Sequence, residues 1–416
     1  MDAKHALGEP RLLISRAALL HNAKLIRSHL RPETRLCAIV KADAYGLGAT
    51  LAVDALCNFA DTPASPVAAS TIPPAVDELA VATIDEAAAL PDEGLPIQVL
   101  RPVENAFLGR ERVRLELAVR SGWTLTVCSP AAAEDLARVA MLVARRADVQ
   151  VMLDTGMTRG GCAPADLPAL VAKIESRPSL RLVGLCTHFV NGELPDDARA
   201  TEQVEVFRAA TDAIAARYGD RLTRHVTNTG GVFHQPDAHL DMVRPGIGLY
   251  GVDPACRPSL DRPLRPAFKW LAPLVDVRDV RRGTTVGYNA TFTAPRDMRV
   301  GLVPCGYADG YPRALSGVGV TLVGGRPAPV IGRVSMDLMT IDLSDAPHAT
   351  VGDDVTLIDN DPLSPASIYD VAQRAGTIPY EILCKIGPRV RRVATDPVDS
   401  LPGLRAAAPG FHWDRR

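Results

Sequence analysis

The sequence has few aromatic residues and little net charge. Phenylalanine, tryptophan and tyrosine make up 5% of the 416 residues, and the formal net charge at pH 7 is −2. So small a charge provides no basic field for nucleic acid and no polybasic patch for an anionic membrane. No apolar run approaches the roughly 18 residues that a membrane-spanning helix needs. We therefore expect no nucleic acid and no membrane among its partners.

The eight cysteines also lack any spacing that indicates a bound metal. They are spread from Cys37 to Cys384, with no Cys-x-x-Cys pair and no Cys/His cluster. Such scatter is typical of reduced thiols and disfavours structural zinc. The segment Met1–His5 lacks the charged-then-apolar pattern of a secretory signal. We expect a cytoplasmic protein without a metal site.

The first part of the chain has the pattern of an α/β barrel. A length of 416 residues favours two domains. Up to about residue 255, eight short apolar runs alternate with helical patterns, and this alternation is typical of a (β/α)8 TIM-like barrel. We place that barrel at residues 10–255. Its candidate strands are Leu36–Val40, Leu79–Ala82, Ile97–Leu100, Thr124–Cys128, Val149–Leu153, Leu182–His188, Arg224–Thr227 and Asp241–Arg244.

The second part has a different texture. Four prolines between residues 254 and 266 mark a linker, and short alternating runs separated by glycine and proline follow. The runs predict a mainly antiparallel β domain over residues 256–398. Residues 399–416 are expected to form a C-terminal tail. The runs are Leu274–Val280, Arg299–Val303, Val318–Val323, Pro329–Asp342 and Asp354–Ile358.

A lysine ends the first predicted barrel strand. Lys41 directly follows Leu36–Val40 and precedes small and glycyl residues. A lysine so placed commonly forms an imine with a carbonyl compound, of which pyridoxal phosphate is the commonest. An isolated lysine would more often be a solvated residue at the start of a loop. The residues at the other strand ends therefore decide whether Lys41 is an imine-forming lysine or a solvated loop residue.

Polar residues follow four further predicted strands. Arg159, His188, Asn228 and Arg244 join Lys41 at or just past the ends of separate strands. Chemistry in a (β/α)8 barrel takes place at that edge, so these side chains are expected to converge.

Two glycine-containing turns suit a phosphate group. Asn228–Gly231 and Gly246–Gly248 each follow a strand and offer a hydroxyl and backbone N–H groups without side-chain bulk. Either turn alone also suits an ordinary connection between a strand and a helix.

Arg244 distinguishes among the reactions of pyridoxal phosphate enzymes. Arginine stays protonated in proteins, so against the ring nitrogen it would donate a hydrogen bond and disfavour a protonated ring. That arrangement suits a proton returned to the same carbon, whereas a decarboxylase or transaminase would favour a carboxylate there.

Tyr288 in the β domain is a second candidate base. Tyrosine has a reference pKa of about 10, so it needs a cationic or hydrogen-bonded environment to act as a base. His188 could link Tyr288 towards Arg244.

Nine segments follow one another in an order that resembles a known family. They span about residues 10 to 395, and are Val40–Gly48, Asp154–Arg159, Thr187–Phe189, His225–Thr229, Val243–Gly251, Gly287–Tyr288, Gly306–Tyr311, Gly332–Asp337 and Tyr380–Ile382. The chain resembles the alanine racemases, which are fold-type III pyridoxal phosphate enzymes. The resemblance implies interconversion of L- and D-alanine, with D-alanine supplied for peptidoglycan.

The resemblance also implies roles for the site residues. Lys41 would bond the cofactor and serve as base for D-alanine, and Tyr288 would be the base for L-alanine on the opposite face. Arg244 would bond the ring nitrogen, and His188 would pack near the ring. Two bases on opposite faces allow a proton to leave one face and return to the other without a swinging group. The further cofactor contacts would be Tyr45, Arg159, Asn228, Thr229, Gly246, Ile247 and Tyr380, and the substrate contacts Arg159, Tyr307, Met336 and Asp337.

In the family the active unit is a homodimer. Tyr288, Tyr307 and Met336 would approach the cofactor bound by the other subunit, so the resemblance implies an active site shared between two copies of the chain.

The sequence departs from the family around Arg159. Family members often have a lysine two residues before the Asp of the Asp-Thr-Gly-Met motif, modified to a carbamate that orients the arginine. That position is Met152 here, and Thr158 and Gly160-Gly161 also differ. Arg159 must therefore be oriented by something else, such as a bound anion or another side chain. Residues 61–122 are longer and richer in proline than expected.

The sequence leaves three other functions open. One is an amino-acid racemase of broader range that accepts serine or basic amino acids. A fold-type III decarboxylase is a second, which Arg244 and Tyr288 disfavour. A non-catalytic pyridoxal phosphate carrier with a single barrel is a third, which the β domain disfavours.

Overall fold

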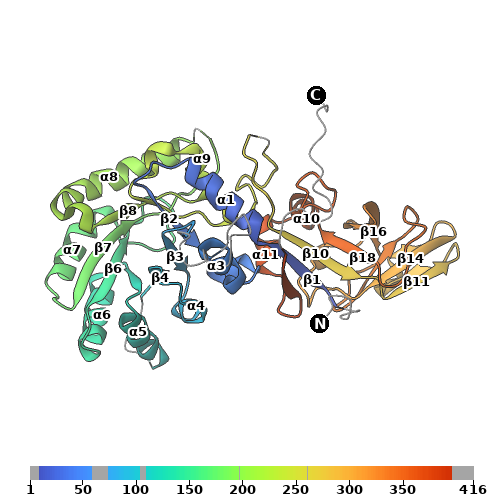
Figure 1. The fold of residues 1–416 in the computed structure, drawn as a ribbon, viewed down its shortest axis with the longest axis horizontal. Helices are drawn as coiled ribbons and strands as arrows, with labels where there is room; N and C mark the ends of the chain where they lie inside the picture. Colours follow the sequence, from blue (N-terminus) through green and yellow to red (C-terminus); the bar gives the residue numbers. More distant parts are fainter. Residues whose placement is uncertain (1–8, 59–73, 104–108, 196, 260, 396–416) are drawn as a thin grey trace, which may run out of the picture. The chain divides into compact units, whose positions relative to one another are not determined.

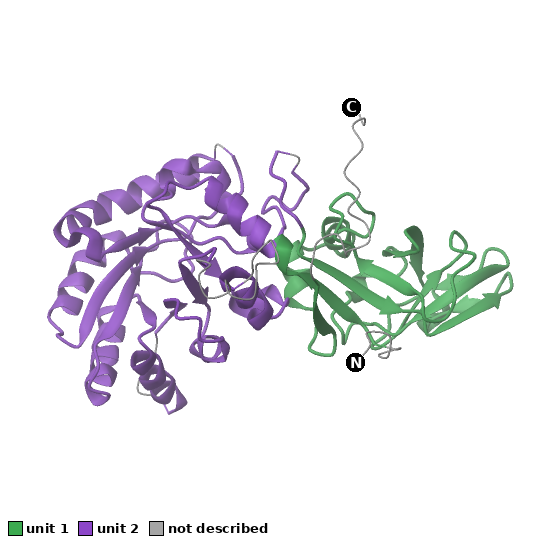
Figure 2. Cartoon of the chain, viewed as in Figure 1, with its two compact units in different colours: residues 1–18, 266–416 green, residues 19–265 purple. Residues whose placement is uncertain are grey.

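The chain forms two compact units. The computed structural model describes residues 9–58, 74–103, 109–195, 197–259 and 261–395 (Figure 1). One unit comprises residues 19–265, and the other combines residues 1–18 with residues 266–416 (Figure 2). The predicted tail and residues 61–73 of the proline-rich segment lie outside the described residues.

The unit of residues 19–265 is a closed parallel barrel. Eight strands form it in sequence order, and each overlaps one of the eight predicted strands, so the predicted fold class is confirmed. The strands are β2 (Arg35–Ile39), β3 (Glu78–Val81), β4 (Ile97–Pro102), β5 (Thr124–Val127), β6 (Ala147–Met152), β7 (Leu180–Cys186), β8 (Thr223–His225) and β9 (Met242–Val243).

Helices surround this barrel, as the green and blue ribbons of Figure 1 show. Local sequence sets several of their starts: Thr83 and Glu86 form a capping box at α4, and Ser129 caps α6 ahead of Pro130. The outward faces of the strands and the inward faces of the helices share one large apolar core. The helices are α1 (Arg16–Ser28), α3 (Ala49–Cys57), α4 (Ile84–Ala89), α5 (Arg110–Ser121), α6 (Pro130–Leu142), α7 (Leu167–Glu175), α8 (Ala198–Tyr218) and α9 (Thr229–His234).

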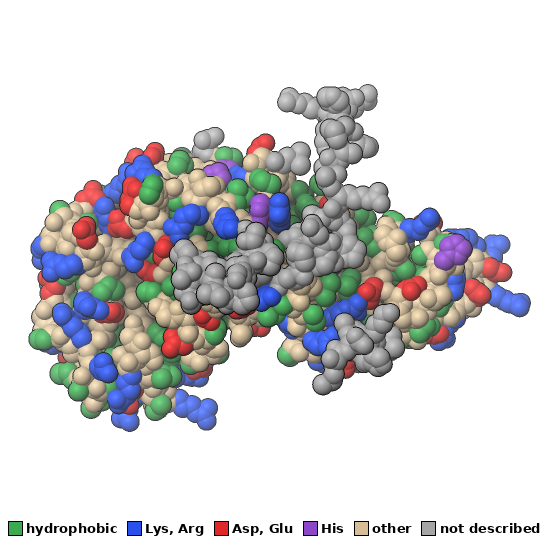
Figure 3. Space-filling view, in the orientation of Figure 1, with side chains coloured by type: hydrophobic (Ala, Val, Ile, Leu, Met, Phe, Trp, Pro, Cys, Tyr) green, Lys and Arg blue, Asp and Glu red, His purple; other side chains and the backbone are tan. Residues whose placement is uncertain are grey.

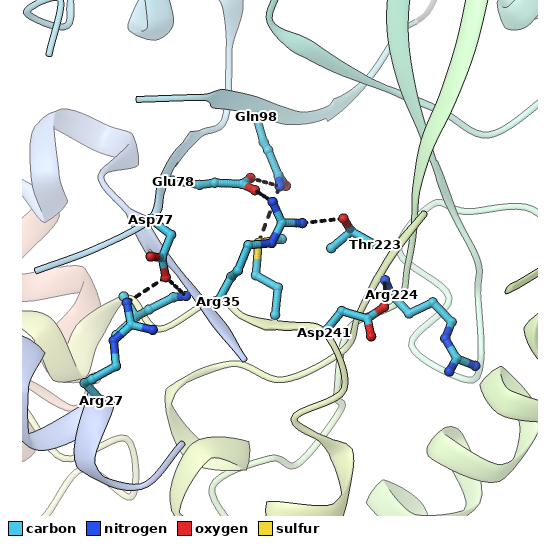
Figure 4. Close-up of polar contacts among 10 residues, drawn as sticks. Arg27, Arg35, Asp77, Glu78, Gln98, Thr223, Arg224 and Asp241 are labelled. Carbon is cyan, nitrogen blue, oxygen red and sulfur yellow. Dashed lines mark hydrogen bonds and ion pairs between the residues drawn. The ribbon is translucent and has the colours of Figure 1, made fainter. Parts of the chain in front are cut away.

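Polar side chains close the barrel at the amino ends of its strands (Figure 4). Arg35 on β2 bonds both Glu78 on β3 and Thr223 on β8, and Gln98 on β4 donates to the other oxygen of Glu78 at 2.6 Å. Burial raises the pKa of Glu78, although Arg35 and Gln98 oppose the rise. Because this end of a (β/α)8 barrel serves stability, the chemistry is expected at the opposite end.

The second unit is built on a nine-stranded sheet. Its order is β11-β14-β17-β16-β15-β18-β10-β1-β19, and every pair is antiparallel except β1 with β19. All five predicted runs lie in it, and Pro329–Asp342 contains parts of two strands. The bounds are β1 (Arg11–Ser15), β10 (Phe268–Pro273), β11 (Asp276–Val280), β14 (Met298–Val303), β15 (Val320–Val323), β16 (Arg326–Ile331), β17 (Met339–Asp342), β18 (Asp354–Ile358) and β19 (Arg391–Thr395).

Four short elements and one strand from the chain's start complete this unit. The hairpin of β12 (Thr285–Val286) and β13 (Phe292–Thr293) stands apart from the sheet, and α10 (Ile368–Ala375) and α11 (Pro379–Cys384) precede β19. No strand is predicted for Arg11–Ser15, which falls within the predicted barrel segment of residues 10–255. In the structure it pairs with β10 and β19.

The described residues show neither a membrane span nor a metal site. No helix among them is long and apolar enough to cross a membrane. Within the same residues, no group of three or more His, Cys, Asp or Glu side chains is arranged to hold a metal ion. Acidic and basic side chains are interspersed on the face drawn in Figure 3, in keeping with the small net charge.

Candidate active site

Lys41 begins a left-handed turn at the carboxyl end of β2. The next four residues, Ala42 to Tyr45, all have φ between 53° and 57°. An L-residue in this conformation costs roughly 1–2 kcal/mol, and strain of this kind clusters at functional sites. The Asp43 carboxylate holds the turn by accepting a hydrogen bond from the Ala49 amide at 2.7 Å.

Glu86 connects this turn to the neighbouring strand. One carboxylate oxygen accepts from the amides of Ala82 and Thr83, at 2.7 and 3.1 Å, and so completes the capping box of α4. The other oxygen accepts from the Ala42 amide at 3.0 Å. Glu86 therefore joins the residue after Lys41 to the end of β3.

Arg244 lies buried just past the end of β9. Its Nη2 donates to the Thr187 carbonyl at 2.6 Å and the Val226 carbonyl at 3.2 Å, and its Nη1 bonds Nδ1 of His225. Burial lowers the pKa of Arg244 and also holds that of His225 well below its usual value, with the Arg244 charge adding to the second effect. A neutral His225 can accept the hydrogen bond, so the guanidinium is fixed by three acceptors.

The histidine that bonds Arg244 is therefore His225. It is not among the site residues predicted from the sequence. His225 ends β8 and pairs in register with Cys186 and Met242 on the flanking strands, so it points into the barrel beside Arg244. The available signal was its place within the predicted strand Arg224–Thr227.

His188 lies where three cationic side chains act on one ring. Burial, then the charges of Arg244, Arg159 and Lys41, lower its pKa to about 3. The imidazole is therefore neutral at physiological pH. The charges of Lys41, Arg159 and Arg244 thus all act on His188, in keeping with the convergence expected at the strand ends.

Hydroxyl groups and glycines form a cradle beside Tyr45. The Thr229 hydroxyl accepts from the Gly246 and Gly248 amides at 3.0 and 3.3 Å. A Cβ on Gly246 would lie 2.2 Å from the Tyr45 hydroxyl, and one on Gly248 would lie 2.5 Å from the Thr229 methyl. Only glycine fits at either position.

Two other predicted residues lie beside this cradle. Asn228 accepts from the Gly231 amide at 3.0 Å and so caps α9, and Ile247 follows Gly246 in the buried turn.

These groups together fit pyridoxal phosphate. The glycine cradle offers the Tyr45 and Thr229 hydroxyls and backbone without side-chain bulk, as a phosphate site requires, Lys41 offers an amine, and Arg244 offers a fixed cation within the barrel. Each belongs to the unit of residues 19–265.

The remaining predicted residues lie in the other unit. Tyr288, Tyr307 and Met336 are exposed there, with 70%, 43% and 53% of their surface accessible. Amides of Tyr307 and Ala308 donate to the carbonyls of Ser335 and Met336, at 3.1 and 3.0 Å, so these loops lie side by side.

Two further predicted residues belong to the same unit. Asp337 pairs with Arg389 at 2.8 Å, and Arg389 also contacts Asp309 at 3.0 Å. Tyr380 lies in the first turn of α11. The structure therefore divides the predicted site residues into one set in each unit.

Comparison with known proteins identifies both units. The family model for the alanine racemase N-terminal domain matches residues 14–254, and that for the C-terminal domain matches residues 267–394. The chain is 36% identical over 381 residues to an alanine racemase of Chlorobaculum tepidum, covering 92% of this chain and 94% of that one. It is 38% identical over 384 residues to one of Laribacter hongkongensis, covering 92% and 97%.

Solved structures agree with these relatives. Alanine racemase from Streptomyces coelicolor A3(2) superposes with a TM-score of 0.81 at 34% identity, covering 95% of this chain and 100% of that one. Alanine racemase from Bartonella henselae, solved with covalently bound pyridoxal phosphate, superposes with a TM-score of 0.76 at 28% identity, covering 93% and 99%.

Proposed function

The chain belongs to the alanine racemase family, and on this premise we propose that it interconverts L-alanine and D-alanine with pyridoxal phosphate as cofactor. The observation that carries the proposal is the convergence of Lys41, Arg159, His188 and Arg244 at the barrel's carboxyl end, beside the glycine cradle. When bound, pyridoxal phosphate supplies the electron-withdrawing group that makes the α-proton of an amino acid acidic.

Arg244 directs the fate of that proton. A guanidinium donates hydrogen bonds and accepts none, so against the cofactor's ring nitrogen it keeps that nitrogen unprotonated. His225 and two carbonyls fix its orientation. The weaker electron withdrawal that results favours return of a proton to the same carbon.

Lys41 and Tyr288 exchange that proton in opposite senses. Lys41 removes the α-proton of D-alanine and gives one back to form it, and Tyr288 does the same for L-alanine. Each base is left protonated after one half of the reaction and is therefore the acid for the reverse direction. Neutral His188 cannot compete as a second cation for the substrate carboxylate, which Arg159 binds.

Substrate and phosphate contacts complete the assignment. Tyr45, Thr229 and the backbone of Gly246 and Ile247 hold the phosphate, with Asn228 shaping the loop and Tyr380 as a further contact. Tyr307, Met336 and Asp337 line the substrate end.

We propose that the active unit is a homodimer. The barrel of residues 10–255 binds the cofactor, and the β domain of residues 256–398 supplies Tyr288 and Met336 to the partner's site. The exposure of Tyr288, Tyr307 and Met336 supports this, because each leaves a large side chain accessible to a partner subunit. All eight cysteines are free thiols, which supports a reducing compartment such as the cytoplasm.

The test of this function is exchange at Cα. Purified protein with pyridoxal phosphate is incubated in deuterated water with L-alanine and, separately, with D-alanine, followed by proton NMR and chiral analysis. Loss of the α-proton signal with formation of the opposite enantiomer is expected from both. Exchange of serine, lysine or arginine but not alanine would show another substrate, whereas cofactor binding without exchange would contradict racemisation altogether.

Removing the Glu86 carboxylate is expected to weaken cofactor binding. Glu86→Ala frees the Ala42 amide, so the strained turn next to Lys41 loses an anchor, and the apparent Kd for pyridoxal phosphate should rise about tenfold. Absorbance titration of the apoprotein measures this. Thr83→Ala is the matched control, because it also breaks the capping box but leaves Ala42 bonded. Equal effects of the two substitutions would show that only helix α4 matters.

A further inference from the structure

The loop that carries Arg159 closes onto its own beginning. It leaves β6 at Met152 and returns at Cys162, where Leu153 and Cys162 form an isolated parallel bridge. The Cys162 amide donates to the Met152 carbonyl and the Asp154 amide to the Cys162 carbonyl, both at 2.9 Å. Residues 154–162 therefore form a short, closed loop at the carboxyl end of the barrel.

The Asp154 carboxylate organises the interior of this loop. Its Oδ1 accepts hydrogen bonds from the Gly156 and Thr158 amides, both at 3.0 Å. Desolvation raises the pKa of Asp154, but the backbone hydrogen bonds from Thr158, Gly156 and Met157 outweigh it and leave the pKa lowered. Thr158, immediately before Arg159, is held at φ 53°, a conformation that a threonine adopts only when its surroundings fix it.

Two glycines allow the loop to lie directly on the strand end. A Cβ on Gly161 would lie 2.6 Å from the Asp154 amide nitrogen and 2.8 Å from the Leu153 carbonyl carbon. A Cβ on Gly160 would lie 3.3 Å from the methyl carbon of Met152. Both glycines have positive φ, at 87° and 105°. The residues on either side of Arg159 are thus fixed through backbone contacts.

The Arg159 side chain itself has no such support. Across the residues that the structure describes, its guanidinium makes no hydrogen bond or ion pair, and the side chain is exposed. The residue beneath the loop, Met152, is uncharged and pairs in register with Cys186 on β7. Its position therefore supplies no charge to orient a guanidinium.

We infer that Asp154 is the positioning residue for Arg159, acting through the Gly156 and Thr158 amides, and that Gly160 and Gly161 seat the loop on Met152. The inference rests on the proposed function, in which Arg159 binds the substrate carboxylate. Met152, Thr158, Gly160 and Gly161 then form one structural unit rather than separate departures from the family. Arg159 is oriented by the fold of its loop and not by a charged neighbour.

The experiment is a double-mutant cycle on the holoenzyme. Variants Asp154→Ala, Arg159→Ala and the double variant are compared for KM and kcat with L-alanine. Binding of propionate, which carries the carboxylate but no amino group, is measured by calorimetry. Asp154→Ala should raise KM and the propionate Kd about 10- to 100-fold, the cost of a misplaced binding group. In the Arg159→Ala background, Asp154→Ala should change KM and the propionate Kd little further, because the Arg159 side chain through which Asp154 acts is absent.

Controls separate positioning from general destabilisation. Asp154→Asn keeps an acceptor oxygen and should restore both constants to within about threefold of the wild type. Asp197→Ala removes another carboxylate that accepts a backbone amide in the same unit, that of Arg199 in the first turn of α8, and should leave both constants unchanged. Amide hydrogen exchange should be faster in residues 154–162 of Asp154→Ala, with the rest of the barrel as in the wild type.

Several outcomes would overturn the inference. Additive effects of Asp154→Ala and Arg159→Ala would show that Asp154 acts elsewhere. An unchanged propionate Kd in Arg159→Ala would show that Arg159 does not bind the carboxylate. Failure of the wild type to racemise alanine is a separate result, and it would contradict the proposed function itself.

Discussion

Replacing Lys41 with alanine is expected to lower the rate of alanine racemisation in both directions by at least about a thousandfold. The amine is both the attachment point for the cofactor and the base on one face, and loss of a positioned acid–base group alone typically costs 10²- to 10⁴-fold. The strained turn from Ala42 to Tyr45 fixes the backbone beside it. Chiral chromatography of alanine after incubation with each enantiomer measures the loss.

The control for Lys41 is a lysine on the barrel's outer surface. Lys173 on α7 pairs with Glu134 at 2.5 Å, and Lys173→Ala should leave racemisation unchanged. Adding a small amine such as methylamine to Lys41→Ala should restore part of the activity, because a free amine can replace the missing base. A variant that keeps more than about a tenth of the wild-type rate would show that Lys41 is not the base.

The barrel could be predicted because its signals are local. Each of the eight predicted strands is a short apolar run followed by polar or glycyl residues, and each overlaps a strand of the structure. The starts of α4 and α6 are likewise set by local signals, because the capping partners of Thr83, Glu86 and Ser129 lie within four residues. Convergence at the strand ends then followed from barrel geometry.

What the sequence did not reveal depends on contacts between distant residues. Arg11–Ser15 becomes a strand because β10 and β19, more than 250 residues away, flank it. His225 fixes Arg244 across two adjacent strands, and a histidine near a strand end gives no sign of its partner. The left-handed turn after Lys41 consists of Ala, Asp, Ala and Tyr, of which the alanines and tyrosine seldom adopt positive φ.

The hydrogen bonds of Glu86 and Asp154 give two sequence motifs a role that the sequence alone does not show. Thr83 and Glu86 have the spacing of a capping box, but only the structure shows the second oxygen of Glu86 on the Ala42 amide. Asp154 was noted as part of a motif, whereas its hydrogen bonds to Gly156 and Thr158 give it a role. In both cases a carboxylate fixes the backbone beside a functional side chain, and neither carboxylate needs to touch the substrate.

Replacing Tyr288 with phenylalanine is expected to separate the two halves of the reaction. Racemisation should fall at least about a hundredfold in both directions, because the proton on the L-face can no longer be removed or returned. With D-alanine in deuterated water, Lys41 still removes and returns a proton, so exchange at Cα with retention of configuration should continue. With L-alanine, exchange should fall together with racemisation. Proton NMR combined with chiral analysis distinguishes the two results.

The asymmetry of this exchange is what identifies two bases. Tyr288 is 70% exposed within its own unit, so loss of one hydroxyl leaves no buried cavity and should not alter the fold. Tyr218→Phe is the control, since Tyr218 bonds Glu175 on the outside of the barrel at 2.7 Å and should not affect exchange of either enantiomer. If Tyr288→Phe reduced the exchange of D-alanine as much as that of L-alanine, exchange on both faces would depend on Tyr288, and Lys41 could not be the independent base for D-alanine. His188 could not take over from either base, because a pKa lowered to about 3 makes its imidazole a very weak proton acceptor.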